Sequence, residues 1–263
     1  MSTEPERGRT PEAAAAIAAI HDRYVREIVE ALGLCPYARR CRESGRLQRP
    51  IFDLQAAPEP TPRACAEAIV QVSREHPDVE VLLLTFAIPR GHRWAEAYAF
   101  EDHARAVREA YAGEFEGKVG PRYYMVAFHP APRRDPQRPV TQDSLVSLIR
   151  RTPDPVIQCI RADLLDGFRR QAQIAAEARF RAEIAKLGPE LQSILAHAVQ
   201  PDPELSSEIA RVNFKSVGQG EGRRTLDALV DELIAARRAV DGDVDDDVDD
   251  AIDDARREDR GPV

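Results

Sequence analysis

The chain has 263 residues, a net charge of −8 and 43% hydrophobic residues, enough apolar material for a buried core. No apolar run approaches the roughly 18 residues of a membrane span, and the polar N-terminus does not resemble a secretory signal. Four scattered cysteines exclude a disulfide framework and indicate free thiols in a reducing compartment. These features predict a cytoplasmic protein without a membrane partner.

The negative charge is concentrated at the C-terminus. Residues 241–263 hold eleven acidic residues against three arginines, which accounts for the whole −8 and leaves residues 1–240 balanced. A balanced folded part gives no strong nucleic-acid signal. Because dense like charge cannot bury a core, the tail is predicted to be disordered, with a protein partner as a candidate role.

The chain is predicted to be disordered over residues 1–9 and to enter a helix at Pro11, with Thr10 as its cap. Apolar residues recur every three or four positions until Gly33 closes this helix, and His21 lies just off the apolar stripe, half-exposed. A short helix follows over 36–43. The later elements are predicted as a short strand at "QRPIFDL", a helix over 62–76, a buried strand over 79–86, a helix over 94–112, a buried strand over 121–128, a short helix or turn at "DSLVSLIRR", a long helix over 155–186, and further helices over 188–198, 203–212 and 225–239.

Alternation of strands and helices predicts an α/β (α+β) fold, with a small mixed sheet of about three to four strands layered with helices. Residues 10–186 form the predicted α/β domain. Residues 187–240 form a C-terminal helical extension, and the acidic tail follows it. Within the extension, the glycine-rich stretch "GQGEG" (218–222) is predicted to be a flexible loop before the last helix.

The segment "GLCPYARRCRE", residues 33–43, is the first candidate for chemistry. Pro36 suits the first helical position, which places Cys35 at the cap, where free N–H groups and the helix dipole ease loss of the thiol proton. Arg39 and the arginines after it add to this effect. The alternative is a thiol that only packs at a helix junction. The gap to Cys41 fits neither a zinc site nor a C-x-x-C pair, so no metal site is predicted.

His129 directly follows the predicted strand over 121–128, and Pro130 ends that strand. Ligands commonly bind at the carboxyl ends of strands in open α/β sheets. A histidine there can serve as a base, a proton shuttle or a ligand. The alternative is a ring hydrogen-bonded to the next loop.

Arginines form the third candidate group. On a predicted helix that is capped by Asp154 and begins at Pro155, Arg161 lies on the apolar face, where a guanidinium needs an anionic partner. That partner is either Glu80 or the carboxylate or phosphate of a substrate. Arg150 and Arg151 precede the same helix, and the arginine fork suits such oxyanions.

Four stretches, "GLCPYA", "EVLLLTF", "VAFHP" and "RRTPDPVIQCIR", resemble in order and spacing a bacterial domain-of-unknown-function family, number 1415. The resemblance covers about residues 20–168. Members carry a Leu-Cys-Pro-Phe-Ala motif, a strand ending in Phe-His-Pro, and Arg-Ser-Pro-x-Pro before a helix with a Leu-Arg pair. The motif positions are occupied here by Cys35, Pro36, His129, Pro130, Arg151, Pro153, Pro155 and Arg161.

The chain departs from the family pattern in "HPAPRRD", where the family carries aromatic residues, at Thr152 in place of serine, and at Ala162, where the family often has glutamate. An aromatic wall and an acidic partner for Arg161 are therefore in question. The family is uncharacterised, so the resemblance implies a fold class and a candidate site, but neither a reaction nor a cofactor.

Motif residues from three distant segments predict one site that contains Cys35, His129, Arg151 and Arg161, with Arg39 beside it. In an enzyme, Cys35 is the nucleophile, His129 its base and the arginines a clamp for a small carboxylate or phosphate substrate. Two alternatives stay open. One is a non-catalytic pocket for an anion or a metal, and the other is an interaction protein that acts through its C-terminal helices and acidic tail.

Overall fold

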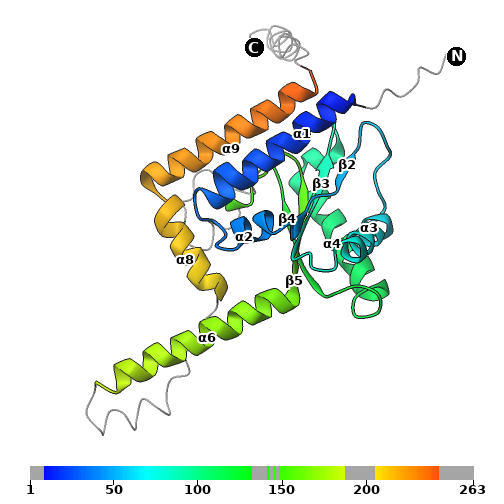
Figure 1. Cartoon of the computed structure of the whole chain (residues 1–263). Helices are drawn as coiled ribbons and strands as arrows, with labels where there is room; N and C mark the ends of the chain where they lie inside the picture. The colour runs from blue at the N-terminus through cyan, green and yellow to red at the C-terminus, as the bar shows by residue number, and fades with distance from the viewer. Residues whose placement is uncertain (1–8, 132–140, 142–144, 146–147, 187–204, 243–263) are drawn as a thin grey trace, which may run out of the picture.

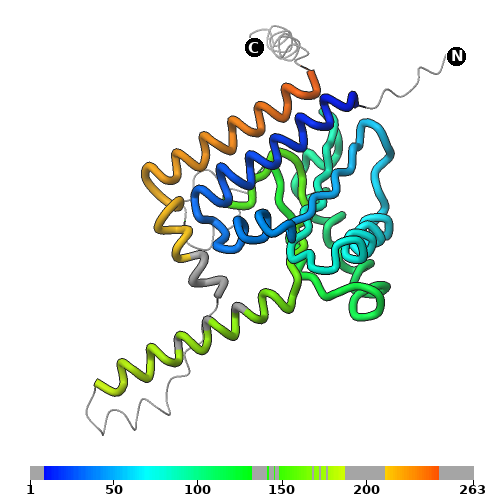
Figure 2. Tube along the Cα trace, in the orientation of Figure 1, coloured from blue at the N-terminus to red at the C-terminus, as the bar shows by residue number. Residues whose placement is uncertain are grey.

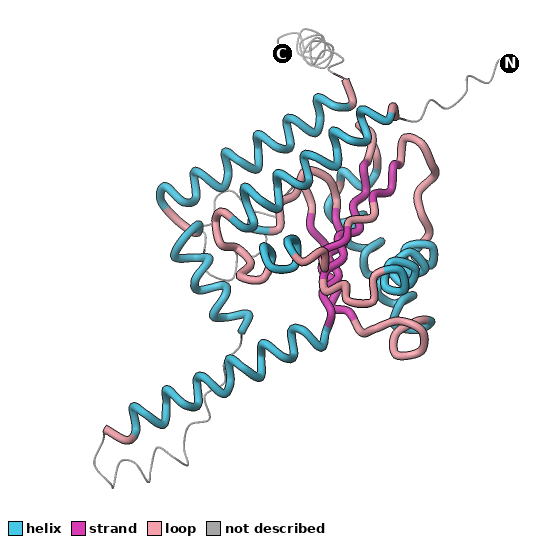
Figure 3. Tube along the Cα trace, viewed as in Figure 1, coloured by secondary structure: helices cyan, strands magenta, loops and turns pink. Residues whose placement is uncertain are grey.

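The computed structural model describes residues 9–131, 141, 145, 148–186 and 205–242. An open, mixed, five-stranded sheet lies between two layers of helices (Figures 1 and 3), so the predicted α/β (α+β) class is confirmed. The predicted disordered ends lie outside the described residues, apart from Arg9, Asp241 and Gly242. In chain order the elements are α1 (Pro11–Arg23), the π-helix η1 (Tyr24–Glu30), α2 (Ala38–Glu43), β1 (Leu47–Gln48), β2 (Ile51–Asp53), α3 (Pro62–Glu75), β3 (Val81–Ala87), the 3-10 turn η2 (Arg93–Ala95), α4 (Ala97–Glu114), β4 (Tyr123–Phe128), β5 (Val156–Arg161), α6 (Ala162–Ile184), α8 (Leu205–Val217) and α9 (Gly220–Val240).

The sheet is parallel on one side and interrupted by one antiparallel strand on the other. β1 and β2 both pair in parallel with β3, along successive parts of it. β5 runs antiparallel between β3 and β4, with Val156 opposite Phe128 and Arg161 opposite Tyr123. The carboxyl ends of β2, β3 and β4 therefore share one edge of the sheet with the start of β5.

The strand β5 corrects the predicted helix over 155–186. Residues 156–161 are extended, and the helix α6 begins only at Ala162. Pro155 is a sound signal for a helix start, but it is followed by Val156 and Ile157, two β-branched residues that are buried in the structure. Pairing with β3 on one side and β4 on the other outweighs the local helix signal.

Alternate residues of β3 face two different cores. Leu82, Leu84 and Phe86 pack in the core beneath α3 and α4, whereas Leu83 packs against the core formed with α1, η1 and α9. An uninterrupted apolar run is the pattern expected of a strand that is covered on both faces. The sequence interpretation of this strand is thus correct.

The last helix, α9, is part of this second core. It lies beside α1 and runs in the opposite direction, so the start of α1 and the end of α9 are neighbours (Figures 1 and 2). Leu226, Val230 and Leu233 of α9 pack in the same cluster as Ile20 and Tyr24. The final part of the predicted 187–240 extension is therefore integral to the fold, while the predicted helix over 188–198 lies outside the described residues.

The glycine-rich stretch 218–222 is a tight corner between α8 and α9, and not the flexible loop that its composition predicts. α9 already begins at Gly220, which has a positive φ of 61°. A Cβ added at Gly222 would lie 1.9 Å from the carbonyl oxygen of Ser216. The backbones of the two helices approach so closely that Gly222 cannot carry a side chain.

Candidate functional site

The shared carboxyl edge of β2, β3 and β4 holds a buried cluster of charges. Its centre is Asp154, which precedes β5 and is 2% exposed. Arg237 of α9 donates from Nε to Asp154 Oδ2 at 2.7 Å, and His21 Nε2 of α1 lies 3.0 Å from the same oxygen. Both partners are as buried as the carboxylate. The cluster therefore joins both surface helices to the sheet edge.

A second arginine extends the cluster towards the chain termini. Arg9 forms ion pairs with Asp53, the last residue of β2, and with Asp241, which also lies 3.0 Å from Arg237. Arg9 donates to the carbonyl oxygen of Ala87 at the end of β3 as well. Each charged group of the cluster thus faces a group of opposite sign, as a structural ion-pair network requires.

Sequence reasoning missed this network. Asp154 is predicted to cap a helix and His21 to be half-exposed, but both are buried and paired with each other. A signal for the missing partner is present in the sequence: Arg237 lies three and four residues after Ile234 and Leu233, on the apolar face of the last helix. An arginine in that position indicates a buried carboxylate elsewhere in the chain.

His129 lies where the sequence predicts, immediately after β4 at the carboxyl edge, and is 8% exposed. Its Nε2 lies 2.9 Å from the carbonyl oxygen of Trp94, and its Nδ1 accepts the N–H of Ala131 at 3.0 Å. Both ring nitrogens of His129 are therefore hydrogen-bonded to main-chain groups. Neither nitrogen is available as a base for Cys35, and the predicted alternative, a ring bonded to the next loop, describes this histidine.

Cys35 is half-buried in the turn before α2, and Tyr37, rather than Cys35, occupies the cap position. Burial raises the pKa of the Cys35 thiol, and the N–H groups of Tyr37 and Ala38 offset this only in part. The predicted activation requires a lowered pKa, so the structure gives the opposite direction. The physical reason is that desolvation of the thiolate outweighs the favourable backbone dipoles.

We expect Cys35 to react slowly with iodoacetamide at neutral pH. The rate should rise with an apparent pKa above the ordinary thiol value of about 8.5. The measurement is the pH dependence of alkylation, read by mass spectrometry of the labelled peptide. The Cys35→Ser variant gives the background from the other three cysteines, which are all buried. An apparent pKa clearly below about 8.5 would restore the activated nucleophile.

A different thiol and imidazole do meet in the core. Cys65 Sγ of α3 lies 3.7 Å from His103 Nε2 of α4, and both side chains are buried. Burial raises the pKa of Cys65 to about 12 and lowers the pKa of His103 to about 4. Both groups are therefore neutral near pH 7 and act as packing elements, because a nucleophile–base pair needs a thiolate within reach of neutral pH.

The predicted arginines do not converge. Arg161 lies at the far end of β5, one strand length from His129, and pairs with Asp163 and with the carbonyl oxygen of Pro77. Its predicted partner Glu80 instead accepts hydrogen bonds from the side chains of Cys41, Arg40 and Arg46. Arg39 is exposed on α2, with its Nε 3.6 Å from Glu30.

Arg151 does lie beside His129. Its Nε donates to the carbonyl oxygen of Pro130 at 3.2 Å, and its Nη2 donates to Asp231 of α9 at 2.7 Å. The main chains of the two segments are also joined, because the N–H of His129 donates to the carbonyl oxygen of Arg150. Of the predicted site, the structure therefore brings together His129 and Arg151, and leaves Arg161 at the opposite edge.

Arg150 differs from its neighbour. The opposite charge that acts on its guanidinium is that of Glu101 on α4. Burial lowers the pKa of this guanidinium, and Glu101 offsets that effect. Within the described part of the chain, no hydrogen bond or ion pair reaches the Arg150 side chain. The other buried or half-buried arginines each have a carboxylate within 4.0 Å, namely Arg9, Arg23, Arg42, Arg46, Arg49, Arg151, Arg161, Arg223 and Arg237.

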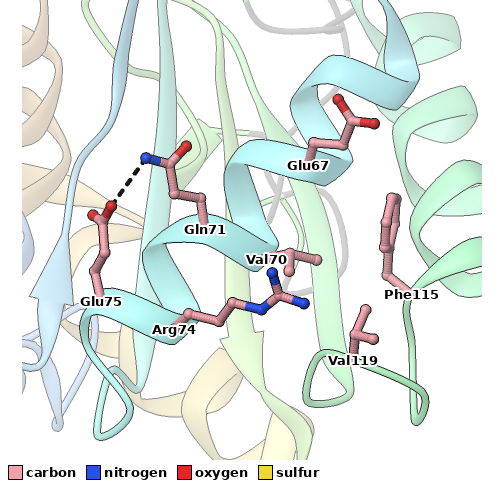
Figure 4. Close-up of a pocket in the computed structure, with 7 residues that line it drawn as sticks. All are labelled: Glu67, Val70, Gln71, Arg74, Glu75, Phe115 and Val119. Carbon is pink, nitrogen blue, oxygen red and sulfur yellow. Dashed lines mark hydrogen bonds between the residues drawn. The ribbon is translucent and has the colours of Figure 1, made fainter.

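A groove of about 430 Å³ lies elsewhere, between α3 and the segment after α4 (Figure 4). Its apolar residues are Val70, Phe115 and Val119, and Arg74 reaches across it in Figure 4. Acidic residues of α3, Glu67 and Glu75, flank this arginine. The groove contains none of the predicted site residues and offers no concentrated positive charge for an anion.

Among residues 9–131, 141, 145, 148–186 and 205–242, no three His, Cys, Asp or Glu side chains are grouped as metal ligands. In the same ranges, no helix is both long and apolar enough to serve as a membrane span. Comparison with family models, with curated proteins and with solved structures gives no match. The site must therefore be interpreted from its own geometry.

Proposed function

We propose that this protein binds a small anion, a carboxylate or a phosphate, through Arg150 at the carboxyl edge of the sheet. One observation carries the proposal. Arg150 is half-buried without an ion-pair partner in the described part of the chain, whereas every other comparably buried arginine there has one.

A charge that leaves water without a partner destabilises the fold, so such charges are kept where they bind something. A guanidinium fork matches the two oxygens of a carboxylate or a phosphate. The carboxyl edge of parallel strands is also the usual place for ligands in open α/β sheets.

The residues of the family resemblance take a positioning role in this proposal. His129 donates its main-chain N–H to the carbonyl oxygen of Arg150, and Arg151 holds the carbonyl oxygen of Pro130. Together these two hydrogen bonds hold the segment after β4 against the segment that contains Arg150 and Arg151. Cys35 has no part in it, because its pKa is raised and both ring nitrogens of His129 are occupied. The proposal is therefore binding, without a Cys-His reaction.

Replacing Arg150 by methionine is expected to have two opposite effects. Binding of the anion should weaken by about 10- to 150-fold, because a charge-assisted hydrogen bond contributes about 1.5–3 kcal/mol. The ligand-free protein should gain about 1 kcal/mol of stability, since an unpaired, half-buried charge is replaced by an apolar side chain of similar length. Calorimetric titration of the full chain with acetate, benzoate and inorganic phosphate, and urea denaturation without ligand, measure the two effects.

The matched control is Arg170→Met, because Arg170 is an exposed arginine of α6. That change should leave both the anion affinity and the unfolding free energy within about 0.5 kcal/mol of the parent. The proposal fails if the parent protein binds none of the three anions, or if Arg150→Met binds them as tightly as the parent does.

A further inference from the structure

The acidic tail leaves the fold at the edge of the sheet that carries Arg150. Asp241, next to the last described residue, forms ion pairs with Arg9 and Arg237, which hold it in the charge cluster of that edge. Arg237 in turn donates to Asp154 at 2.7 Å, and Asp154 follows Arg150 by four residues in the chain. The point at which the tail begins is thus fixed near the segment that contains Arg150.

The tail beyond Gly242 is long enough to reach Arg150. Four residues of chain span at most about 14 Å, which limits the distance from Asp154 to Arg150. Residues 243–263 add 21 residues, and their composition predicts a disordered chain. Such a chain has a mean end-to-end distance of at least about 25 Å, because repulsion between like charges extends it. Carboxylates of the tail can therefore meet the guanidinium of Arg150.

The tail also has the charge that Arg150 lacks as a partner. Residues 243–263 contain ten acidic residues and three arginines, whereas residues 1–240 are balanced. Arg150 is half-buried and has no ion-pair partner within the described ranges. An aspartate side chain ends in the same carboxylate as acetate, so the tail and a free anion compete for one guanidinium. Exposed arginines near the tail, such as Arg238, attract it less, because water screens their charge more fully.

We infer that the acidic tail, residues 243–263, is an internal competitor that occupies Arg150 when no other anion is bound. This inference rests on the proposed function and adds the regulation of the same site. The tether brings the tail carboxylates to the site at an effective concentration in the millimolar range. A single contact between a carboxylate and a guanidinium is weak, so the tail holds the site for part of the time and a ligand displaces it.

The test uses the full chain with the ten acidic residues of 243–263 replaced by Asn or Gln, which keeps the length of the tail. In calorimetric titrations, this neutral-tail variant should bind acetate and inorganic phosphate about threefold to tenfold more tightly than the parent, because the competitor is removed. The matched control replaces the tail arginines Arg256, Arg257 and Arg260 by Gln. That tail is more negative than the parent tail, so both affinities should fall.

A second measurement separates contact with Arg150 from general repulsion by the charge of the tail. The main-chain amide NMR signals of residues 243–263 should shift in Arg150→Met, because this change releases the tail. Arg170→Met removes an exposed positive charge and should leave the signals in place. Saturating acetate should shift the same signals in the parent protein and have no effect on them in Arg150→Met.

The outcomes distinguish this inference from the proposed function. If the parent binds anions through Arg150 and the neutral-tail variant binds them equally well, the tail is not a competitor, while the anion site stands. A gain in affinity combined with tail signals that do not respond to Arg150→Met overturns the contact between the tail and Arg150. If neither the parent nor the neutral-tail variant binds a probe, the site is overturned and the inference with it.

Discussion

Replacement of Asp154 by alanine is expected to lower the free energy of unfolding by about 3–5 kcal/mol, the usual effect of removing one partner from a buried ion pair. The change leaves a cavity beside Arg237, 3% exposed, and His21, 2% exposed, and Asp241 is then the one carboxylate that remains paired with Arg237 among the described residues. Urea denaturation, followed by circular dichroism, measures the difference.

Two controls test the cause. Asp231→Ala removes the exposed partner of Arg151 and should cost less than about 1 kcal/mol. The double variant Asp154→Leu with Arg237→Met should recover much of the lost stability, because it removes both charges and fills the space. A double variant as unstable as Asp154→Ala would show that packing around Asp154, rather than an uncompensated charge, causes the loss.

The second large effect is expected at the corner between α8 and α9. Gly222→Ala should cost about 3 kcal/mol or more, because its Cβ meets the Ser216 carbonyl oxygen at 1.9 Å and a backbone atom cannot rotate away. The measurement is again the free energy of unfolding.

Gly113→Ala is the matched control for this change. Gly113 also lies in a helix, α4, but a Cβ there meets no atom within 4 Å. It should therefore stabilise the protein by up to about 1 kcal/mol through helix propensity. Equal destabilisation by both variants would mean that the loss reflects glycine's conformational freedom and not the close contact of the two helices.

The fold could be predicted from sequence wherever a local pattern decides the structure. Helices that begin at Pro11 and Pro62, each capped by the preceding threonine, follow directly from capping and periodicity. The apolar run of β3 indicated a strand that is covered on both faces. β5 was not predictable in this way, because Pro155 gives a local helix signal and the competing signal is pairing with strands about 30 and 75 residues earlier.

The candidate site, too, could be predicted only where a local sequence pattern decides the structure. The sequence correctly placed His129 at the carboxyl end of a strand, and the register then brought Arg151 beside it. Arg161 is predicted to share this site because it occupies a motif position and lies on the apolar face of a predicted helix. As the last residue of β5 it lies instead at the other end of the sheet. Arg150 could not be distinguished from Arg151 by sequence. The difference between them is that Arg151 pairs with Asp231 of α9, whereas the charge of Glu101 on α4 acts on Arg150, and this depends on how α4 and α9 pack.

The position of β5 has a consequence for biosynthesis. β3 and β4 leave the ribosome first, but they do not pair with each other, because the strand between them is made last. A nascent chain that ends before residue 161 therefore presents unpaired strand edges, which are the sites at which chains associate wrongly. The arginine partner of Asp154, Arg237, is made later still, on α9. This protein is expected to complete its fold only when nearly the whole chain has been released, and to depend on protection from aggregation until then.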